Sequence, residues 1–248
     1  MSEPRASAEE QPASPAAVRL VVINGGVSDP SSTRLLTDRI AQKSIDALAA
    51  SGVGAEVSTI SLGPIAVDIA RSLVSGFPAE KVQSAIDRLA GADAIIAGTP
   101  VYKAGVSGLF KSFIDLIDND LLLAKPVLLA ATGGSERHAM VVDEHLRPLF
   151  AFLRAIPVPT SLYAAPGDWG SSELGRRIDR AATELAAVVR SGIAKDIADN
   201  NWSRHDHQFA GNATRAERAG TDIDFGSELM RLAVGGVGGT LGGERLDG

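Results

Sequence analysis

Residues 25–34 combine glycine and hydroxyl side chains in a pattern suited to binding an anion. They follow an apolar run, precede a helical pattern, and include Ser28, Ser31, Ser32 and Thr33. Ser31 or Ser32 can cap the helix, whose free N–H groups and positive dipole end attract negative charge. The stretch lacks the Gly-Lys-Ser/Thr end of a Walker loop and the G-x-G-x-x-G spacing of a dinucleotide fold. Hydroxyls with little positive charge, which Arg34 could supplement, suit the terminal phosphate of a mononucleotide; a plain helix cap is the alternative.

A second candidate stretch, residues 98–108, has properties suited to a flat ring. Pro100 fixes its own φ and gives up a donor, and we expect the N–H groups after it to face the polar edge of a heterocycle. Gly105 and Gly108 let the backbone approach a ligand closely, and Tyr102 offers an aromatic face and a hydroxyl. The alternative is an ordinary connection between a strand and a helix, in which Pro, Gly and Ser are common.

The elements that position these stretches are predicted from the hydrophobic pattern. Five apolar or β-branched runs predict strands at residues 18–24, 55–61, 92–98, 126–131 and 156–163. Helical spacing predicts helices within residues 35–49, 78–91, 109–116, 139–155 and 174–189. Pro148 marks a kink or break in the fourth of these helices. We expect residues 62–77 to be irregular, and the prolines of the fifth strand to confine it to an edge of the sheet.

Alternating strands and helices predict an α/β fold with a doubly wound parallel sheet. In the strand order 2-1-3-4-5, the first, third and fourth strands are neighbours, so their loops frame one crevice. The third of these loops, residues 132–135, reads Thr-Gly-Gly-Ser. We therefore expect one loop to bind a phosphate and the other two to hold a ring between them.

Composition limits the class of protein. The chain has 248 residues, 45% apolar composition, a net charge of −6 and no cysteine. These values predict one domain without disulfides, thiolate chemistry or a basic surface for nucleic acid. No apolar run approaches the roughly 18 residues of a membrane helix, and no signal peptide is evident, so we expect a soluble cytoplasmic protein. We predict a disordered tail over 1–16, a domain over 17–192, and an extension over 193–248 with one short helix within 224–234.

Two motifs together resemble the NAD(P)H-dependent FMN reductase family, which is flavodoxin-like. They are Thr99-Pro100-Val101-Tyr102-Lys103-Ala104 with Ser107-Gly108, and the stretch from Gly26 to Leu36. The second motif is similar to the phosphate loop of a subfamily that accompanies luciferase-like monooxygenases. The resemblance covers about residues 18–192. One departure is Gly26, where many members carry Ser, so this chain lacks one hydroxyl donor.

The resemblance implies FMN in the predicted crevice and a homodimer or homotetramer with flavin sites near the subunit interface. The residues that match the family's phosphate binders are Ser28, Ser31, Ser32 and Thr33. The residues that match the loop under the isoalloxazine ring are Pro100, Val101 and Tyr102. The residues that match the third flavin loop are Thr132, Gly133, Gly134 and Ser135.

The function that follows is hydride transfer from NADH or NADPH to FMN, with reduced FMN supplied to a partner monooxygenase. No catalytic side chain is predicted, because the cofactor carries the chemistry. Two alternatives stay open: a quinone, azo or metal-ion reductase that retains FMN, and a flavodoxin-type electron carrier. His205 and His207 have spacing that metal ligands can have, but two histidines in a polar stretch favour a solvated loop.

Overall fold

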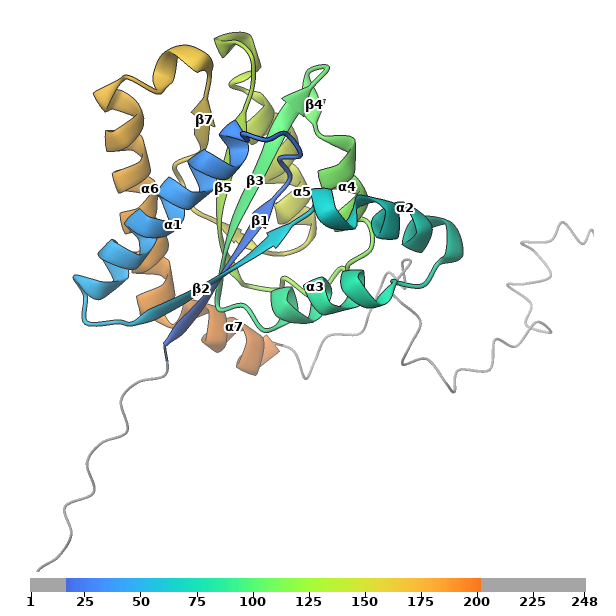
Figure 1. Ribbon diagram of the computed structural model, residues 1–248. Coiled ribbons are helices and arrows are strands. Elements are labelled where there is room, and N and C mark those ends of the chain that lie inside the picture. The colour runs from blue at the N-terminus through green and yellow to red at the C-terminus, as the bar shows by residue number, and fades with distance from the viewer. Residues whose placement is uncertain (1–16, 202–248) are drawn as a thin grey trace, which may run out of the picture. The chain divides into compact units, whose positions relative to one another are not determined.

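A parallel β-sheet forms the centre of the molecule in the computed structural model, which describes residues 17–201 (Figure 1). The strands are β1 (Val18–Asn24), β2 (Ala55–Ser61), β3 (Ala94–Tyr102), β5 (Pro126–Thr132), β6 (Ile156–Pro157) and β7 (Leu162–Ala164). Their order is β2-β1-β3-β5, with β6 and β7 both paired to β5 in parallel. Because β6 and β7 are two pieces of the predicted fifth strand, the flavodoxin-like order 2-1-3-4-5 is confirmed.

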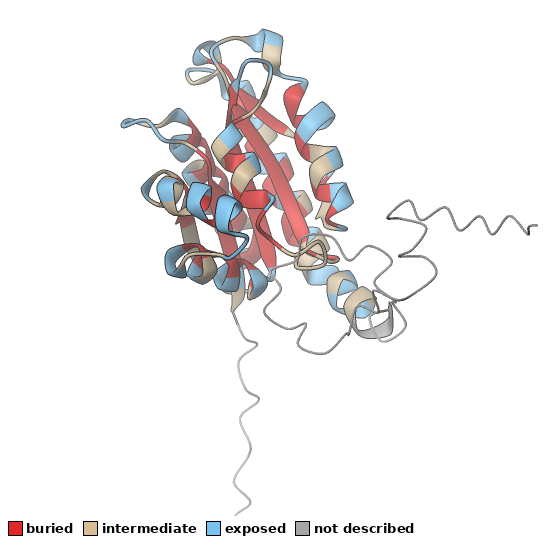
Figure 2. Ribbon diagram, turned by 90° about the vertical axis from the view of Figure 1, so that its right-hand side faces the viewer, coloured by how far each residue is buried: buried red, intermediate tan, exposed pale blue. Residues whose placement is uncertain are grey.

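Helices cover both faces of this sheet, as the continuous burial of its inner strands requires. Within β1, Leu20 and Val22 face one layer, whereas Val21 and Ile23 face the other. The first layer contains α1 (Ser32–Ala49) and α6 (Ser172–Ser191), and the second contains α2 (Ala66–Ser75), α3 (Glu80–Ala90), α4 (Gly108–Ile114) and α5 (Arg147–Phe152). Figure 2 shows the buried sheet between helices whose outer surfaces are exposed.

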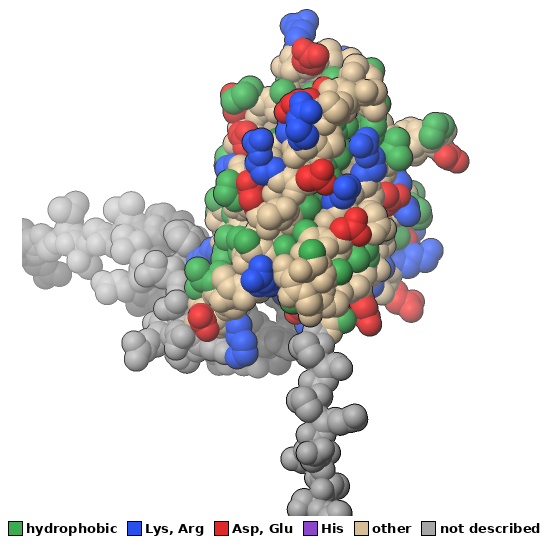
Figure 3. Space-filling view, turned by 90° about the vertical axis from the view of Figure 1, so that its left-hand side faces the viewer, with side chains coloured by type: hydrophobic (Ala, Val, Ile, Leu, Met, Phe, Trp, Pro, Cys, Tyr) green, Lys and Arg blue, Asp and Glu red, His purple; other side chains and the backbone are tan. Residues whose placement is uncertain are grey.

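Helices α1 and α6 lie side by side on their face of the sheet. Each carries an apolar stripe, with Leu36 and Ile40 buried on α1 and Ile178 and Leu185 buried on α6. The outer surface of this face carries interspersed acidic and basic side chains (Figure 3), which include the ion pair of Lys43 and Asp179 at 2.9 Å. The apolar stripes therefore pack on the sheet while the charged sides stay in water.

The prediction that residues 62–77 are irregular is wrong, because most of this stretch is helical. A 3₁₀ turn over Gly63–Ile65 leads into α2, which ends at Gly76. Pro64 lies in the first turn of the 3₁₀ segment, where a missing N–H does no harm. Gly76 has a φ of 75° and caps α2 in the left-handed region. Glycine and proline therefore mark the ends of short helices here.

The predicted helix over residues 139–155 is also divided. A 3₁₀ turn over Glu136–His138 precedes it, a π-helical turn spans Val142–Leu146, and α5 begins at Arg147. Pro148 lies in the first turn of α5, a position at which proline is favoured.

The prediction that the third strand ends at Gly98 is wrong as well. Strand β3 continues to Tyr102 and turns back into β4 (Gly105–Val106) as a tight antiparallel hairpin. Helix α6 ends at a left-handed cap at Gly192 and is followed by α7 (Ile193–Asn201). The polar sequence of this region did not suggest α7.

Several expectations lie outside the described residues, namely the tail over 1–16, the short helix within 224–234 and the histidines at 205 and 207. None of the helices within residues 17–201 is long and apolar enough to cross a membrane.

Candidate functional site

The turn after β1 brings the chain into α1 through a set of short polar contacts. The buried side chain of Asn24 accepts a hydrogen bond from the N–H of Gly26 at 3.1 Å. The hydroxyl of Ser31 accepts one from the N–H of Arg34 at 3.2 Å, so the predicted cap is confirmed. A Cβ at position 26 would lie 2.2 Å from Ser31 Oγ. Ser31 therefore fills the space that a serine at position 26 would need.

The N-terminus of α1 leaves donors available for an anion. Ser31 satisfies the N–H groups of Arg34 and Leu35, whereas those of Ser32 and Thr33 have no acceptor within the helix. The side chain of Ser32 is exposed beside them. The guanidinium of Arg34 pairs instead with Asp38 one turn further along, at 2.8 Å. The site therefore offers N–H groups and hydroxyls rather than an unpaired cation.

Two buried hydroxyls join this turn to the loop after β5. Thr33 and Thr132 are 1% and 3% exposed, and their Oγ1 atoms are 2.7 Å apart. The hydroxyl of Ser32 approaches the same Thr132 oxygen at 3.4 Å. Because β3 lies between β1 and β5 in the sheet, this contact spans the end of the central strand. The first and third predicted loops therefore do converge.

The middle loop is the β3–β4 hairpin, and its geometry differs from an open loop. Tyr102 pairs with Gly105 across the turn, while Lys103 and Ala104 have φ of 49° and 61°. The tyrosine side chain is 53% exposed, whereas Pro100 is buried in the strand. The N–H groups after Pro100 therefore lie in a paired hairpin, and Tyr102 is the exposed residue among the three predicted ring-loop residues Pro100, Val101 and Tyr102.

Thr99 and Ser107 fasten the hairpin to the helix that follows. The buried Oγ1 of Thr99 accepts a hydrogen bond from the N–H of Ser107 at 3.1 Å. The hydroxyl of Ser107 in turn caps α4 by accepting from the N–H of Phe110 at 3.1 Å. Two successive hydroxyls thus fix the direction in which the hairpin leaves the sheet.

Hydrogen bonds to β7 fix the position of the loop after β5. Gly133 donates to the carbonyl of Ala164 at 3.2 Å, and the Tyr163 hydroxyl donates to the carbonyl of Ser135 at 2.6 Å. Burial raises the pKa of Tyr163, and the negative charge of Asp168 adds to the shift. The hydroxyl therefore stays protonated at neutral pH and remains a donor.

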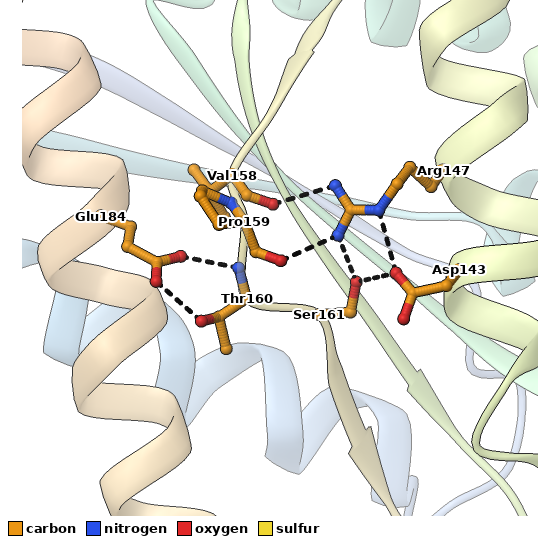
Figure 4. Close-up of polar contacts among 7 residues, drawn as sticks. All are labelled: Asp143, Arg147, Val158, Pro159, Thr160, Ser161 and Glu184. Atoms are coloured by element: carbon orange, nitrogen blue, oxygen red, sulfur yellow. Dashed lines mark hydrogen bonds and ion pairs between the residues drawn. The ribbon is translucent and has the colours of Figure 1, made fainter.

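Figure 4 shows how the connection from β6 to β7 is itself held. From one side, Arg147 donates to the carbonyls of Val158 and Pro159, each at 3.1 Å. From the other side, the carboxylate of Glu184 on α6 accepts from the N–H and the hydroxyl of Thr160, each at 2.7 Å. Side chains therefore supply the contacts that a continuous fifth strand would have made through its backbone.

Asp143 completes this arrangement. It accepts hydrogen bonds from Arg147 at 2.9 Å and from the Ser161 hydroxyl at 2.6 Å. Partial burial alone would raise the pKa of Asp143, but the bonds from Ser161 and Arg147 and the charge of Arg147 outweigh it and lower the pKa below its ordinary value. The carboxylate is thus ionised at neutral pH and holds Arg147 in place.

The predicted binding residues fall into two groups by exposure. Those open to solvent, fully or partly, are Ser28, Ser31, Ser32, Tyr102, Gly133, Gly134 and Ser135. Those buried are Thr33, Pro100, Val101 and Thr132. The buried residues help to form the loops. We therefore predict direct contact with a ligand only for the residues that are open to solvent.

Three residues with clear roles in the site were missed by sequence reasoning. Asn24 closes the first turn, Thr99 fastens the hairpin, and Tyr163 supports the third loop. Asn24 could have been found as an Asx residue directly after a strand. Thr99 lies in the motif singled out above, but the sequence did not assign it a role, and Tyr163 acts on another segment, for which the sequence carries no local signal.

The polar groups at these strand ends fit a phosphorylated flavin. Free N–H groups and hydroxyls at a helix N-terminus suit a phosphate, and the neighbouring glycine loop and tyrosine suit a ring. The model of the NADPH-dependent FMN reductase family matches residues 18–170. The chain belongs to the NADPH-dependent FMN reductase family. It is accordingly an NAD(P)H-dependent oxidoreductase with FMN and NAD(P)H as its cofactors.

Relatives of the reductase match it over most of their length. The FMN reductase (NADPH) of Pseudomonas aeruginosa is 38% identical over 179 residues, which cover 70% of this chain and 93% of that protein. The NADH-dependent FMN reductase SfnE of Pseudomonas putida is 38% identical over 170 residues, covering 68% of this chain and 89% of the relative. These relatives differ in the nicotinamide nucleotide that their names specify.

Solved structures support the same fold. An oxidoreductase from Corynebacterium diphtheriae is 39% identical with a TM-score of 0.69, covering 71% of the reductase and 98% of that chain. The apo form of an NADH:FMN oxidoreductase, EMOB, is 25% identical with a TM-score of 0.58, covering 69% of this chain and 89% of its own.

Within the described range of the reductase, no group of three or more His, Asp or Glu side chains is placed to hold a metal ion.

Proposed function

We propose that the protein oxidises NADH or NADPH with FMN and releases reduced FMN to a flavin-dependent monooxygenase. The observation that carries this proposal is the 2.7 Å contact between Thr33 and Thr132, which joins two of the three predicted flavin loops. A phosphate held at the start of α1 then has a ring-binding loop directly beside it.

The chain's own residues divide the work of binding. The N–H groups of Ser32 and Thr33, with the hydroxyls of Ser28 and Ser32, hold the phosphate. Tyr102 lies along the ring on one side, and backbone groups of residues 133–135 face its polar edge on the other. When bound, FMN supplies the redox chemistry by accepting a hydride, and no acid or base from the protein is assigned.

The charge of the phosphate site favours release of the flavin. The nearest arginine, Arg34, is engaged with Asp38, so neutral donors carry the phosphate interaction. Hydrogen bonds of N–H groups and hydroxyls to a charged group contribute about 1.5–3 kcal/mol each. Because Arg34 is engaged with Asp38, it adds no ion pair with the phosphate to these bonds. Modest retention suits a protein that passes reduced FMN to a partner. The resemblance of residues 26–36 to the subfamily that accompanies luciferase-like monooxygenases supports the same partner.

The assembly and location of the protein belong to this proposal too. We expect a homodimer or homotetramer in the cytoplasm, as the family resemblance and the absence of cysteine from the sequence suggest.

The proposal is tested by steady-state oxidation of NADH and NADPH, with and without added FMN. We expect little oxidation without FMN, turnover that saturates with FMN, and sequential kinetics in which FMN behaves as a substrate. If no nicotinamide is oxidised at any FMN concentration, the reductase assignment is wrong. If FMN copurifies with the protein and a quinone or azo dye is reduced with ping-pong kinetics, the release step is wrong.

A further inference from the structure

A recess of about 420 Å³ lies on the outer side of the third flavin loop. It is lined by Gly134, Ser135, Glu136, Arg137, Ala165, Pro166 and Gly167. These residues lie in two 3₁₀ segments or directly before them; one segment follows β5 over Glu136–His138 and the other follows β7 over Pro166–Asp168. The recess is therefore built at the tips of two paired strands, next to the sheet edge.

This recess is distinct from the proposed flavin crevice but continuous with it. No residue of the α1 turn or of the β3–β4 hairpin lines it. Gly134 and Ser135 belong both to the lining of the recess and to the loop that we predict to contact the flavin. A ligand that reaches over this loop would occupy both spaces.

Arg137 is the one cationic side chain in the lining of the recess. Within residues 17–201 its guanidinium forms no hydrogen bond or ion pair, in contrast to Arg34, Arg147 and Arg176, which each pair with a carboxylate. Arg137 is also exposed. Its five N–H donors are thus available to a ligand in a geometry that matches phosphate oxygens.

The opposite wall is compatible with an anion. Asp168, which follows the lining residue Gly167, turns its carboxylate inward to accept the N–H of Ala165 at 2.7 Å. Ala165, Pro166 and Gly167 therefore present apolar and backbone surface to the recess. Glu136 is the single carboxylate in the lining, and no ion pair joins it to Arg137.

We propose that this recess binds a phosphate of the adenosine half of the nicotinamide dinucleotide, through Arg137. The inference rests on the proposed function, since it assumes that the nicotinamide reaches the flavin from the side of residues 134–135. The second half of the dinucleotide then extends over the loop into the recess. The phosphate is either the pyrophosphate, which NADH and NADPH share, or the 2′-phosphate, which only NADPH carries.

The test compares Arg137→Ala with wild type and with Arg180→Ala, a matched removal of an exposed arginine on α6. Two measurements are made: KM for NADPH and NADH, and calorimetric binding of adenosine 2′,5′-bisphosphate and of ADP to the flavin-free protein. Loss of a charge-assisted hydrogen bond pair predicts roughly 10- to 100-fold weaker binding in Arg137→Ala, with kcat unchanged. Arg137→Lys should recover only part of the affinity, because lysine keeps the charge without the planar fork.

Each outcome decides the inference. A loss confined to NADPH and the 2′,5′-bisphosphate supports the 2′-phosphate, and an equal loss for both nucleotides supports the pyrophosphate. Wild-type KM and binding in Arg137→Ala, or an equal loss in Arg180→Ala, overturns the inference and leaves the reductase function intact. If wild type fails to oxidise either nucleotide, the proposed function fails separately, and the calorimetric arm still decides the role of Arg137.

Discussion

Buried hydroxyls at the ends of the sheet strands have a positioning role that their residue types alone did not reveal. Ser28, Ser31, Ser32 and Thr33 look alike in the sequence, yet Ser32 is exposed whereas Thr33 is buried against Thr132. Helical geometry explains the difference, because successive residues of α1 point about 100° apart. Hydroxyls that are open to solvent and a hydroxyl that joins two loops therefore lie within one short stretch.

The Thr33–Thr132 contact predicts a non-additive pair of substitutions. Thr132→Val alone leaves the buried Thr33 hydroxyl without this partner, and Thr33→Val alone leaves Thr132 only the Ser32 hydroxyl at 3.4 Å. Each single substitution should cost about 1–3 kcal/mol of unfolding free energy. The double variant removes both hydroxyls and should cost clearly less than the sum. Urea unfolding of the four proteins measures this coupling. Additive costs would show that the two hydroxyls do not interact.

Gly133 predicts a second coupling at this scale. A Cβ at this position would lie 2.3 Å from the Tyr163 hydroxyl. Gly133→Ala should displace that ring, lose its hydrogen bond to Ser135, and destabilise the protein by about 1–3 kcal/mol. Adding Tyr163→Phe removes the clashing oxygen, so the double variant should be more stable than additivity predicts.

Gly134→Ala is the control for this experiment, because a Cβ there meets nothing within 4 Å. Thermal unfolding should leave Gly134→Ala near wild type and lower the melting temperature of Gly133→Ala. Equal effects of the two substitutions would contradict the close approach of Tyr163.

The elements that bear the site were predictable where a hydrophobic period runs unbroken. The bounds of β1 and β2 match those predicted, and the core stripe of α6 was recognised. The failures involve short segments. Helix α2 was missed because Gly63, Pro64 and Gly76 read as loop signals, although they mark helix ends. Strand β3 was cut short because Pro100 suggested a turn, whereas it lies within the strand.

The broken edge strand predicts a pH-dependent contribution to stability. The pKa of Asp143 is lowered in the folded protein, so its contribution is present above the ordinary carboxyl value of 3.8 and is lost as pH falls through the lower folded value. In Asp143→Asn, Arg147 and Ser161 lose this partner. We expect the variant to unfold at lower temperature than wild type near pH 7, and the gap to shrink below about pH 4.

Melting temperature measured from pH 7 to pH 2.5 checks this expectation. Glu144→Gln, an exposed neighbour on the same π-helical turn, is the control and should follow wild type throughout. A gap between Asp143→Asn and wild type that is constant over this range would contradict the account, since it would show that the ionised carboxylate is not what stabilises the β6–β7 connection.

At the scale of the whole molecule, the strand order decides where the site is. The alternation of strands and helices predicted a doubly wound sheet, and in the order 2-1-3-4-5 the first, third and fourth strands are neighbours, which the sheet confirms. The sequence could not show which segments support those strand ends from a distance. Contacts such as Tyr163 with Ser135 and Arg147 with Val158 join residues from separate elements, and they depend on the folded geometry.

The most direct test of the central claim is the affinity of the protein for FMN compared with riboflavin, measured by flavin fluorescence in wild type and in Ser32→Ala. If the start of α1 holds the phosphate beside the ring loops, FMN should bind roughly 10- to 100-fold more tightly than riboflavin. Ser32→Ala should reduce that preference by weakening FMN alone. Equal affinity of wild type for the two flavins, or an equal loss of both in Ser32→Ala, would contradict the account.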